Sequence, residues 1–406
     1  MPQAVLKTSS KPFAAPWAYN EYGVCMSISS VVAQDRAVDQ LQQALRSKRV
    51  PHAYIFHGPA GVGKELCAGE FAKIILCENR QKKRHNKEDF FDCCDTCVSC
   101  RGIEADTHPD FHLVYREQIR ELEGESGTHK ATTLAIDVIR EKLNRPARLT
   151  SAYGQGKVFV VREIHLANAA AQNALLKTLE EPPDGTVLIL LADQLEGLLP
   201  TVISRCQIVT FSPLPEDFLL ERLSQAGYEQ LESRFWARFA DGSLGRALWF
   251  AHQQWYETKI ELLEHLALLS DSRVVESAEL LMNLAKTHAS QLRKQDPVIS
   301  DTVAKHKMYS FLLAVIGTFY RDLMLCRSGS TPSACIHADQ EPLLASAAEG
   351  IDLRDASRAV SLIARAEHLI HTNVNANLVL EDLLGDLAQM NPLGPQGRAS
   401  PARTRQ

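Results

Sequence analysis

The glycine-rich segment at residues 54–65, YIFHGPAGVGKE, is the stretch whose residue types most clearly specify a chemistry. Gly58, Gly63 and Lys64 match the phosphate-binding pattern G-x-x-x-x-G-K, and Gly61 lies inside the same loop. Glycines let successive backbone N–H groups point at one anion, and the lysine ammonium and the helix dipole add positive potential. These four residues therefore form a candidate nucleotide-binding site. The alternative is a strand-to-helix turn that binds no ligand.

Two positions that hold Mg²⁺ in hydrolysing P-loop proteins carry other side chains here. Such proteins place Ser or Thr directly after the lysine, whereas this sequence has Glu65. They also end a neighbouring strand in an aspartate, often followed by a catalytic glutamate, whereas residues 157–161 lead into Arg162 and Glu163. We expect two independent losses of metal contacts and no ATP hydrolysis at this loop. Because Lys64 is retained, binding of ATP or ADP without Mg²⁺ stays open.

Four of the ten cysteines fall within residues 93–100, which indicates a metal site. Cys94, Cys97 and Cys100 have the spacing C-x₂-C-x₂-C, and Cys77 offers a fourth thiolate. Zinc prefers four soft ligands in a tetrahedron, and a full thiolate set leaves no open position for water, so the site is expected to be structural. Cys93 is a competing ligand. The alternative is a set of free thiols.

Length and composition limit the class of protein. The chain has 406 residues, which suits two or three domains, and its formal net charge of −5 argues against a strongly basic nucleic-acid binder. Residues 1–28 show no sustained apolar segment of a signal peptide, and no run approaches the length of a membrane span. We therefore expect a cytoplasmic protein, in which clustered cysteines bind metal rather than form disulfides.

The apolar runs alternate with helical patterns, which predicts a doubly wound parallel sheet of five strands with the P-loop at its carboxyl edge. The expected strands are at residues 54–56, 110–115, 157–161, 186–192 and 207–211. The expected helices are at residues 30–49, 66–76, 134–143 (ending before Pro146), 168–179 and, as a short helix, near 195–203.

Other segments of the same domain carry weaker signals. The polar stretch between Cys77 and Cys93 is interpreted as a solvated loop, and residues 118–132 as a surface loop. Arg205 lies between a helix and a strand, and we expect it on the same side of the sheet as the P-loop. A lone arginine in such a place is most often part of a surface ion pair.

The remainder of the chain is expected to be helical. Proline residues near position 213 mark a linker, after which residues 213–255 form a small helical lid and residues 256–392 an all-α domain. Residues 1–29 are an N-terminal extension to a P-loop domain at residues 30–212, with a zinc module at 77–100. The Gly-, Pro- and Arg-rich tail at residues 393–406 is expected to be disordered.

Several motifs resemble the AAA+ clamp loader subunits of bacterial DNA polymerase III. They are PHAYIFHGPAGVGK (51–64), the cysteine cluster, THPDFH (107–112), AAAQNALLKTLEEPP (169–183), SRC (204–206), GSLGRAL (242–248) and NVNANLVLEDLL (373–384). The resemblance covers roughly residues 30–390. It implies an AAA+ domain with a zinc module, a lid and a C-terminal collar that oligomerises. It also implies that Arg205 of SRC is an arginine finger for ATP bound by the adjacent subunit.

With Glu65 and Arg162 at these two positions, the sequence resembles the delta' type of subunit. That type serves as a stator and does not hydrolyse ATP itself. The resemblance then implies a non-motor subunit whose partners are gamma/tau and delta type subunits, the sliding clamp and primed DNA, with no membrane. Two alternatives remain. One is an ATP-hydrolysing motor-type subunit with Glu163 as the base, and the other is a zinc-containing nucleic-acid adaptor that uses the P-loop fold as a scaffold.

Overall fold

The computed structural model describes residues 27–85, 88–123, 133–267, 269–295, 299–372 and 374–390. The chain divides into two compact units, Met1–Pro215 and Glu216–Gln406. Most of the expected N-terminal extension and all of the expected disordered tail lie outside the described residues. The further division of the second unit into a lid and a collar stays a prediction.

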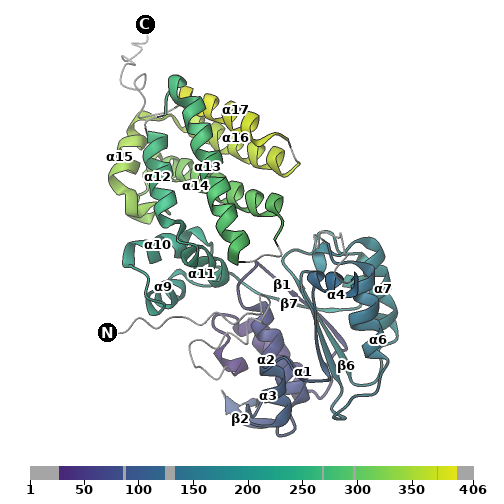
Figure 1. Ribbon diagram of the computed structural model, residues 1–406. Helices are drawn as coiled ribbons and strands as arrows, with labels where there is room; N and C mark the ends of the chain where they lie inside the picture. The colour runs from purple at the N-terminus through teal and green to yellow at the C-terminus, as the bar shows by residue number, and fades with distance from the viewer. Residues whose placement is uncertain are drawn as a thin grey trace. The chain divides into compact units, whose positions relative to one another are not determined.

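The first unit is built on a parallel sheet (Figure 1), whose strand order is β4-β5-β6-β1-β7. The strands are β1 (Ala53–His57), β4 (Phe111–Val114), β5 (Lys157–Val161), β6 (Thr186–Ala192) and β7 (Gln207–Thr210). All five strands predicted from the apolar runs are confirmed. Because β1 is paired with β6 on one side and with the edge strand β7 on the other, the P-loop that follows β1 emerges one strand in from the end of the carboxyl edge.

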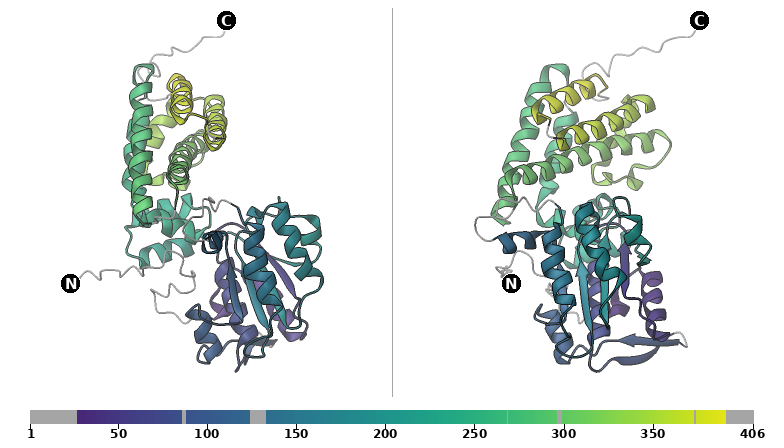
Figure 2. Two further views of the ribbon diagram at one scale, coloured as in Figure 1. Left: turned by 45° about the vertical axis from the view of Figure 1, so that its right-hand side comes forward. Right: turned by 90° about the vertical axis from the view of Figure 1, so that its right-hand side faces the viewer.

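Helices cover both faces of this sheet, as Figures 1 and 2 show. On one face lie α1 (Asp35–Arg46), α2 (Lys64–Leu76) and α3 (Val98–Glu104). The other face packs against α5 (Ile136–Val138), the π-helical segment η4 (Ile139–Asn144), α6 (Arg145–Ala147), α7 (Ala169–Glu180) and α8 (Pro200–Ile203). The helix expected to end before Pro146 therefore continues to Ala147.

Alternation of side chains along each strand explains the two packed faces. In β1, Tyr54 contacts Phe71 of α2 with ring centroids 5.5 Å apart. Ile55, the next residue, belongs to the hydrophobic cluster of the opposite face together with Leu175 of α7. Both faces of a parallel sheet are thus buried, which is why its strands appear in the sequence as continuous apolar runs.

One loop prediction is wrong, and a second is wrong for those of its residues that the structure describes. The polar stretch after Cys77 forms an antiparallel hairpin of β2 (Gln81–His85) and β3 (Glu88–Asp92). The side chain of Gln42 on α1 forms two hydrogen bonds with the backbone of Phe91, and these anchor the hairpin. In the second loop, the short turn η3 (Arg116–Gln118) leads into α4 (Ile119–Glu123), and residues 124–132 lie outside the described residues.

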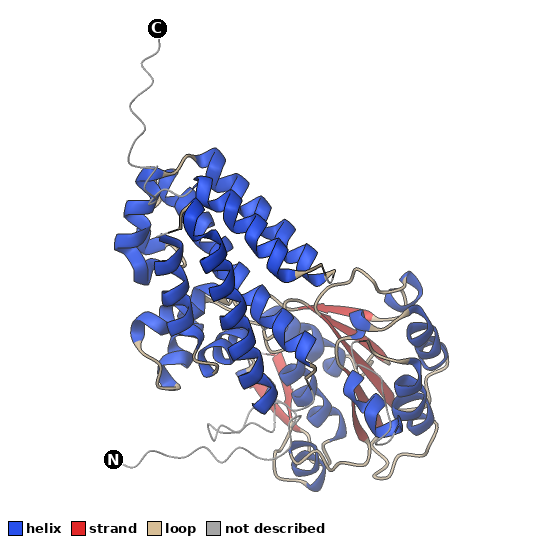
Figure 3. Cartoon of the chain, turned by 45° about the horizontal axis from the view of Figure 1, so that its top comes forward, coloured by secondary structure: helices blue, strands red, loops and turns tan. Residues whose placement is uncertain are grey.

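The described residues of the second unit contain helices and no strand (Figure 3). The helices are α9 (Glu216–Gln225), α10 (Gln230–Phe239), α11 (Leu244–His252), α12 (Trp255–Ala267), α13 (Val274–Gln295), α14 (Asp301–Arg327), α15 (Glu341–Gly350), α16 (Leu353–His371) and α17 (Ala376–Met390). The predicted helical character of this region is confirmed. Its core includes aromatic rings, with Trp255 and Phe311 only 4.7 Å apart between centroids.

The long helix α14 corrects one expectation of the sequence. Among the described residues, this helix alone is long and apolar enough to span a membrane, with a mean hydropathy of 1.3 over its most apolar window. Half of that window is buried inside the unit, where α14 packs against α13, α15 and α16. Core helices of globular proteins meet the same two criteria, so this helix is weak support for a membrane span.

Candidate functional site

The glycine-rich loop joins β1 to α2 at the carboxyl edge of the sheet. Gly58 has a φ of 150°, and a Cβ atom there would lie 2.3 Å from the carbonyl oxygen of Phe211, so only glycine fits beside the end of β7. Gly63 precedes the first residue of α2 with a φ of 99°, in the left-handed region. Gly61 also has a positive φ. The structure therefore brings the three predicted glycines and Lys64 together in one loop at a helix N-terminus.

Lys64 is buried, and partners within the protein satisfy its charge. Its Nζ atom donates to the carbonyl oxygens of Gly58 and Pro59 and to Oδ1 of Asp193 at 2.8 Å. Asp193 directly follows β6, so its carboxylate also lies at the carboxyl edge. Burial lowers the pKa of Lys64, and the Asp193 carboxylate opposes that shift. A phosphate group in this loop would compete with Asp193 for the ammonium.

The two replaced metal positions contact each other. Nε of Arg162 donates to Oε1 of Glu65 at 2.7 Å, and Nη2 of Arg162 contacts the same oxygen. Burial raises the pKa of Glu65, while the Arg162 guanidinium opposes that rise. The expectation of two independent losses is therefore wrong, because the replacements form one ion pair. Since the Glu65 carboxylate is already engaged by a cation, these residues do not fit the Mg²⁺ of a hydrolysing P-loop.

Glu163, the residue at the position of the catalytic glutamate, also has a partner in the chain. Its backbone is in the left-handed region with a φ of 49°, and its Oε2 atom lies 3.3 Å from Nε of Arg116. The carboxylate thus forms an ion pair with a cation of the same unit.

The cysteine cluster lies between α2, the hairpin and α3. The sulfur atoms of Cys77, Cys94, Cys97 and Cys100 all lie within 4.8 Å of one another. Those of Cys77 and Cys94 are 3.5 Å apart, and those of Cys77 and Cys97 are 4.0 Å apart. Thiolates that share a tetrahedral Zn²⁺ at about 2.3 Å lie about 3.8 Å from one another. The four predicted cysteines therefore fit a metal ion.

Two backbone groups support this cluster. The amide of Cys97 donates to Sγ of Cys94, and the amide of Cys100 donates to Sγ of Cys97, each at 3.4 Å. Such amide donors stabilise negative charge on sulfur, as metal ligation requires. Cys93, the competing ligand, instead lies with its Sγ atom 3.0 Å from Oδ1 of Asp95.

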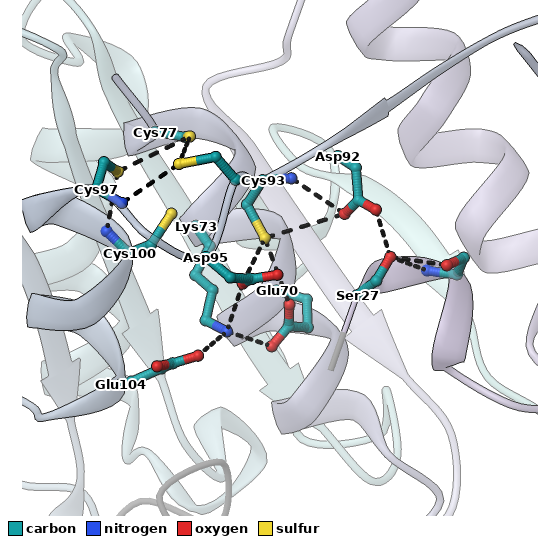
Figure 4. Close-up of polar contacts among 12 residues, drawn as sticks. Ser27, Glu70, Lys73, Cys77, Asp92, Cys93, Asp95, Cys97, Cys100 and Glu104 are labelled. Atoms are coloured by element: carbon teal, nitrogen blue, oxygen red, sulfur yellow. Dashed lines mark hydrogen bonds and ion pairs between the residues drawn. The ribbon is translucent and has the colours of Figure 1, made fainter. Parts of the chain in front are cut away.

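A buried lysine that the sequence analysis missed links the cysteine cluster to the P-loop helix (Figure 4). Nζ of Lys73 on α2 lies 3.0 Å from Glu70, 3.4 Å from Asp95 and 2.7 Å from Glu104. Asp95 belongs to the cysteine loop and Glu104 ends α3, so one ammonium joins three elements. Apart from the i,i+3 spacing of Glu70 and Lys73, nothing in the sequence indicates these contacts.

Arg205 lies at the opposite edge of the sheet from the P-loop, so its expected placement is wrong. It precedes β7 by two residues, at the amino end of that strand, whereas the P-loop follows the carboxyl end of β1. The length of β7 alone, from Gln207 to Thr210, is about 10 Å. The Nη2 atom of Arg205 lies 2.8 Å from Glu180, the last residue of α7. The Nη1 atom of Arg205 donates to the Thr201 carbonyl at 2.9 Å. The ion pair is partly exposed to solvent.

The fold and these groups define a P-loop domain that carries a four-cysteine module and a second, helical unit. Residues 33–215 match a protein family described as DNA polymerase III, delta subunit. The chain is 31% identical over 303 residues to the DNA polymerase III subunit delta' of Escherichia coli, an alignment that covers 69% of this chain and 84% of that protein. It is 24% identical over 353 residues to subunit delta' of Bacillus subtilis, covering 86% of this chain and 95% of that protein.

Subunit tau of Bacillus subtilis is also similar, with 32% identity over 224 residues that cover 54% of this chain. This chain spans only 36% of the length of that tau subunit. The chain belongs to the bacterial DNA polymerase III family of delta' and tau/gamma clamp loader subunits, as its motifs predict. The predicted five-stranded parallel sheet, with the P-loop at its carboxyl edge, is confirmed.

Proposed function

We propose that this chain is a non-motor subunit of the sliding-clamp loader, which presents Arg205 to ATP bound by a neighbouring gamma/tau type subunit. The position of Arg205 carries this proposal. Because Arg205 and the P-loop lie at opposite edges of one sheet, the guanidinium serves a nucleotide on another subunit and not one in its own loop. A guanidinium supplied in trans stabilises charge on a transferred γ-phosphoryl group.

The state of the P-loop supports a role without hydrolysis. Lys64 is engaged by Asp193, and the position that would offer a hydroxyl to Mg²⁺ holds Glu65 in an ion pair. ATP or ADP could bind only without the usual metal ligands. In this proposal the subunit works in the cytoplasm with delta type subunits, the sliding clamp and primed DNA, and its second unit supplies the collar.

We also propose that Cys77, Cys94, Cys97 and Cys100 hold one structural Zn²⁺. The sulfur separations support this, as does the pair of amide donors. When bound, Zn²⁺ would supply a cross-link between the end of α2 and the segment that leads into α3. Four thiolates leave no position for a reacting water, so this site has no catalytic role in the proposal.

The second candidate is a motor-type subunit. It is favoured by the similarity to tau over about half of this chain and by the retained glycines and Lys64. The ion pairs of Glu65 with Arg162 and of Glu163 with Arg116 oppose it. The third candidate, a zinc-containing nucleic-acid adaptor, is supported by the cysteine cluster and by no other feature of the described residues.

ATP turnover by the isolated chain separates the first two candidates. We expect the purified protein to release no phosphate from ATP above the background of the assay, because the residues present do not fit Mg²⁺. Phosphate release at about 1 per second or more, within the usual range of enzymes, that disappears in Lys64→Ala would establish the motor candidate. Release that persists in Lys64→Ala would indicate a contaminating ATPase.

A further inference from the structure

The ion pair between Glu65 and Arg162 connects α2, the helix that follows the P-loop, with the end of β5. Glu65 is the second residue of α2, and Arg162 directly follows β5. The two side chains are largely buried, with 21% and 16% of their surface exposed. The Arg162 guanidinium also lies over the ring of Tyr115, 5.5 Å from its centroid, and its backbone amide donates to Val114. Arg162 is thus held by an ion pair, a cation–π contact and a backbone hydrogen bond.

These are the two positions that Mg²⁺ joins in hydrolysing P-loop proteins, where a hydroxyl after the lysine and a carboxylate at the end of the strand lie on either side of one metal ion. Here the same two positions are joined by a cation and an anion that both belong to the protein. The carboxylate belongs to Glu65 on the helix α2, and the positive charge is the guanidinium of Arg162, which follows the strand β5.

We infer that the Glu65–Arg162 pair takes the structural place of the Mg²⁺ link and makes the P-loop of this chain independent of metal. The inference rests on the proposed absence of hydrolysis and adds its physical cause. Either residue alone would leave an unpaired charge: Glu65 would lie near Glu163, and Arg162 would lose its carboxylate partner. The two replacements therefore act as one unit, and restoring a single metal ligand is expected to lower the stability of the fold.

Thermal unfolding of the full chain tests the coupling. The variants are Glu65→Thr, Arg162→Asp, the double variant Glu65→Thr/Arg162→Asp and the exchanged pair Glu65→Arg/Arg162→Glu. Magnesium is omitted from the buffer and no chelator is added, because a chelator would also remove the proposed Zn²⁺ from the cysteine cluster. Each single variant is expected to lower Tm by about 5 °C, and the exchanged pair to recover most of that loss. Arg145→Ala is the matched control, since the exposed Arg145–Glu141 pair should change Tm by less than about 1 °C.

Binding of Mn²⁺ in the presence of ADP, followed by electron paramagnetic resonance, tests the replacement of the metal. The wild-type chain and the exchanged pair are expected to retain no Mn²⁺ at the loop, and the double variant to gain one ion per chain that is lost on adding Lys64→Ala. If the double variant is unfolded, the exchanged pair tests the inference instead. A recovered Tm without bound Mn²⁺ would support it, and a Tm as low as that of the single variants would contradict it.

Single variants as stable as the parent would overturn the inference. So would Lys64-dependent Mn²⁺ binding by the wild type, or a folded double variant that gains no Mn²⁺. None of these measurements involves a partner subunit. Their failure therefore leaves the proposed role of Arg205 untouched, and a failure of the Arg205 proposal leaves the ion pair intact.

Discussion

Replacing Arg205 by alanine is expected to abolish ATP turnover at one neighbouring site of the reconstituted clamp loader and, with it, loading of the clamp onto primed DNA. The proposed role is stabilisation of transition-state charge on a partner's γ-phosphoryl group, and loss of an arginine finger lowers the rate at its site by roughly three to five powers of ten. The measurement is steady-state phosphate release by the complex in the presence of clamp and DNA.

The fold of the chain should survive this substitution. Arg205 is partly exposed, and its ion pair with Glu180 is of the kind that contributes about 1 kcal/mol or less. Glu180→Gln is the matched control, because it removes the same ion pair and keeps the guanidinium, so the complex should stay active. Arg205→Lys should rescue poorly, since lysine lacks the planar fork. Equal loss of activity in Glu180→Gln and Arg205→Ala would point to local structure and not to a delivered guanidinium.

Removing one thiolate of the cysteine cluster is expected to have the second large effect. Cys97→Ser should lose the metal, because the Cys97 sulfur belongs to the predicted set and caps the start of α3. Structural Zn²⁺ contributes apparent binding free energies of about 10–16 kcal/mol in zinc-finger peptides. Since the contacts of Lys73 remain after the metal is lost, a smaller loss of local stability, on the order of 3 kcal/mol, is expected here.

Elemental analysis and hydrogen exchange together check this prediction. Wild-type protein purified under reducing conditions should contain one zinc per chain, and Cys97→Ser should contain none and exchange faster in α3 and the hairpin. Cys93→Ser is the control, because Cys93 lies against Asp95 and outside the four-cysteine set. The ligand set would be wrong if Cys93→Ser lost the metal and Cys97→Ser kept it. Wild-type protein without zinc would contradict the site altogether.

The sheet and the local motifs could be predicted because their signals are local. The continuous apolar runs of β5 and β6 follow from burial on both faces, and the C-x₂-C spacing specifies neighbouring sulfurs before any fold is known. The hairpin at residues 81–92 escaped prediction because its strands are polar and depend on contacts with α1, such as those of Gln42. The hairpin is stabilised by contacts with another part of the fold, and a pattern of apolar residues along the sequence does not reveal such contacts.

The contacts that matter most to function are between residues far apart in the sequence. Glu65 and Arg162 could each be recognised as a departure from the metal-binding pattern, but only the fold shows that they meet. The edge occupied by Arg205 was misassigned because ligands of parallel sheets are expected at the carboxyl edge. In the proposed role, Arg205 serves a nucleotide of a neighbouring subunit and is free of that constraint. It precedes β7 by two residues, which puts it at the amino edge.

The central claim, that this chain works through Arg205 and not through its own P-loop, is tested most directly by comparing two substitutions in one assay. Clamp loaders are reconstituted with the wild-type chain, with Lys64→Ala or with Arg205→Ala, and steady-state ATP turnover is measured with clamp and primed DNA. The account predicts that Lys64→Ala matches the wild-type rate and that Arg205→Ala loses the turnover of one site. The opposite pattern, with Lys64→Ala inactive and Arg205→Ala at the wild-type rate, would contradict it.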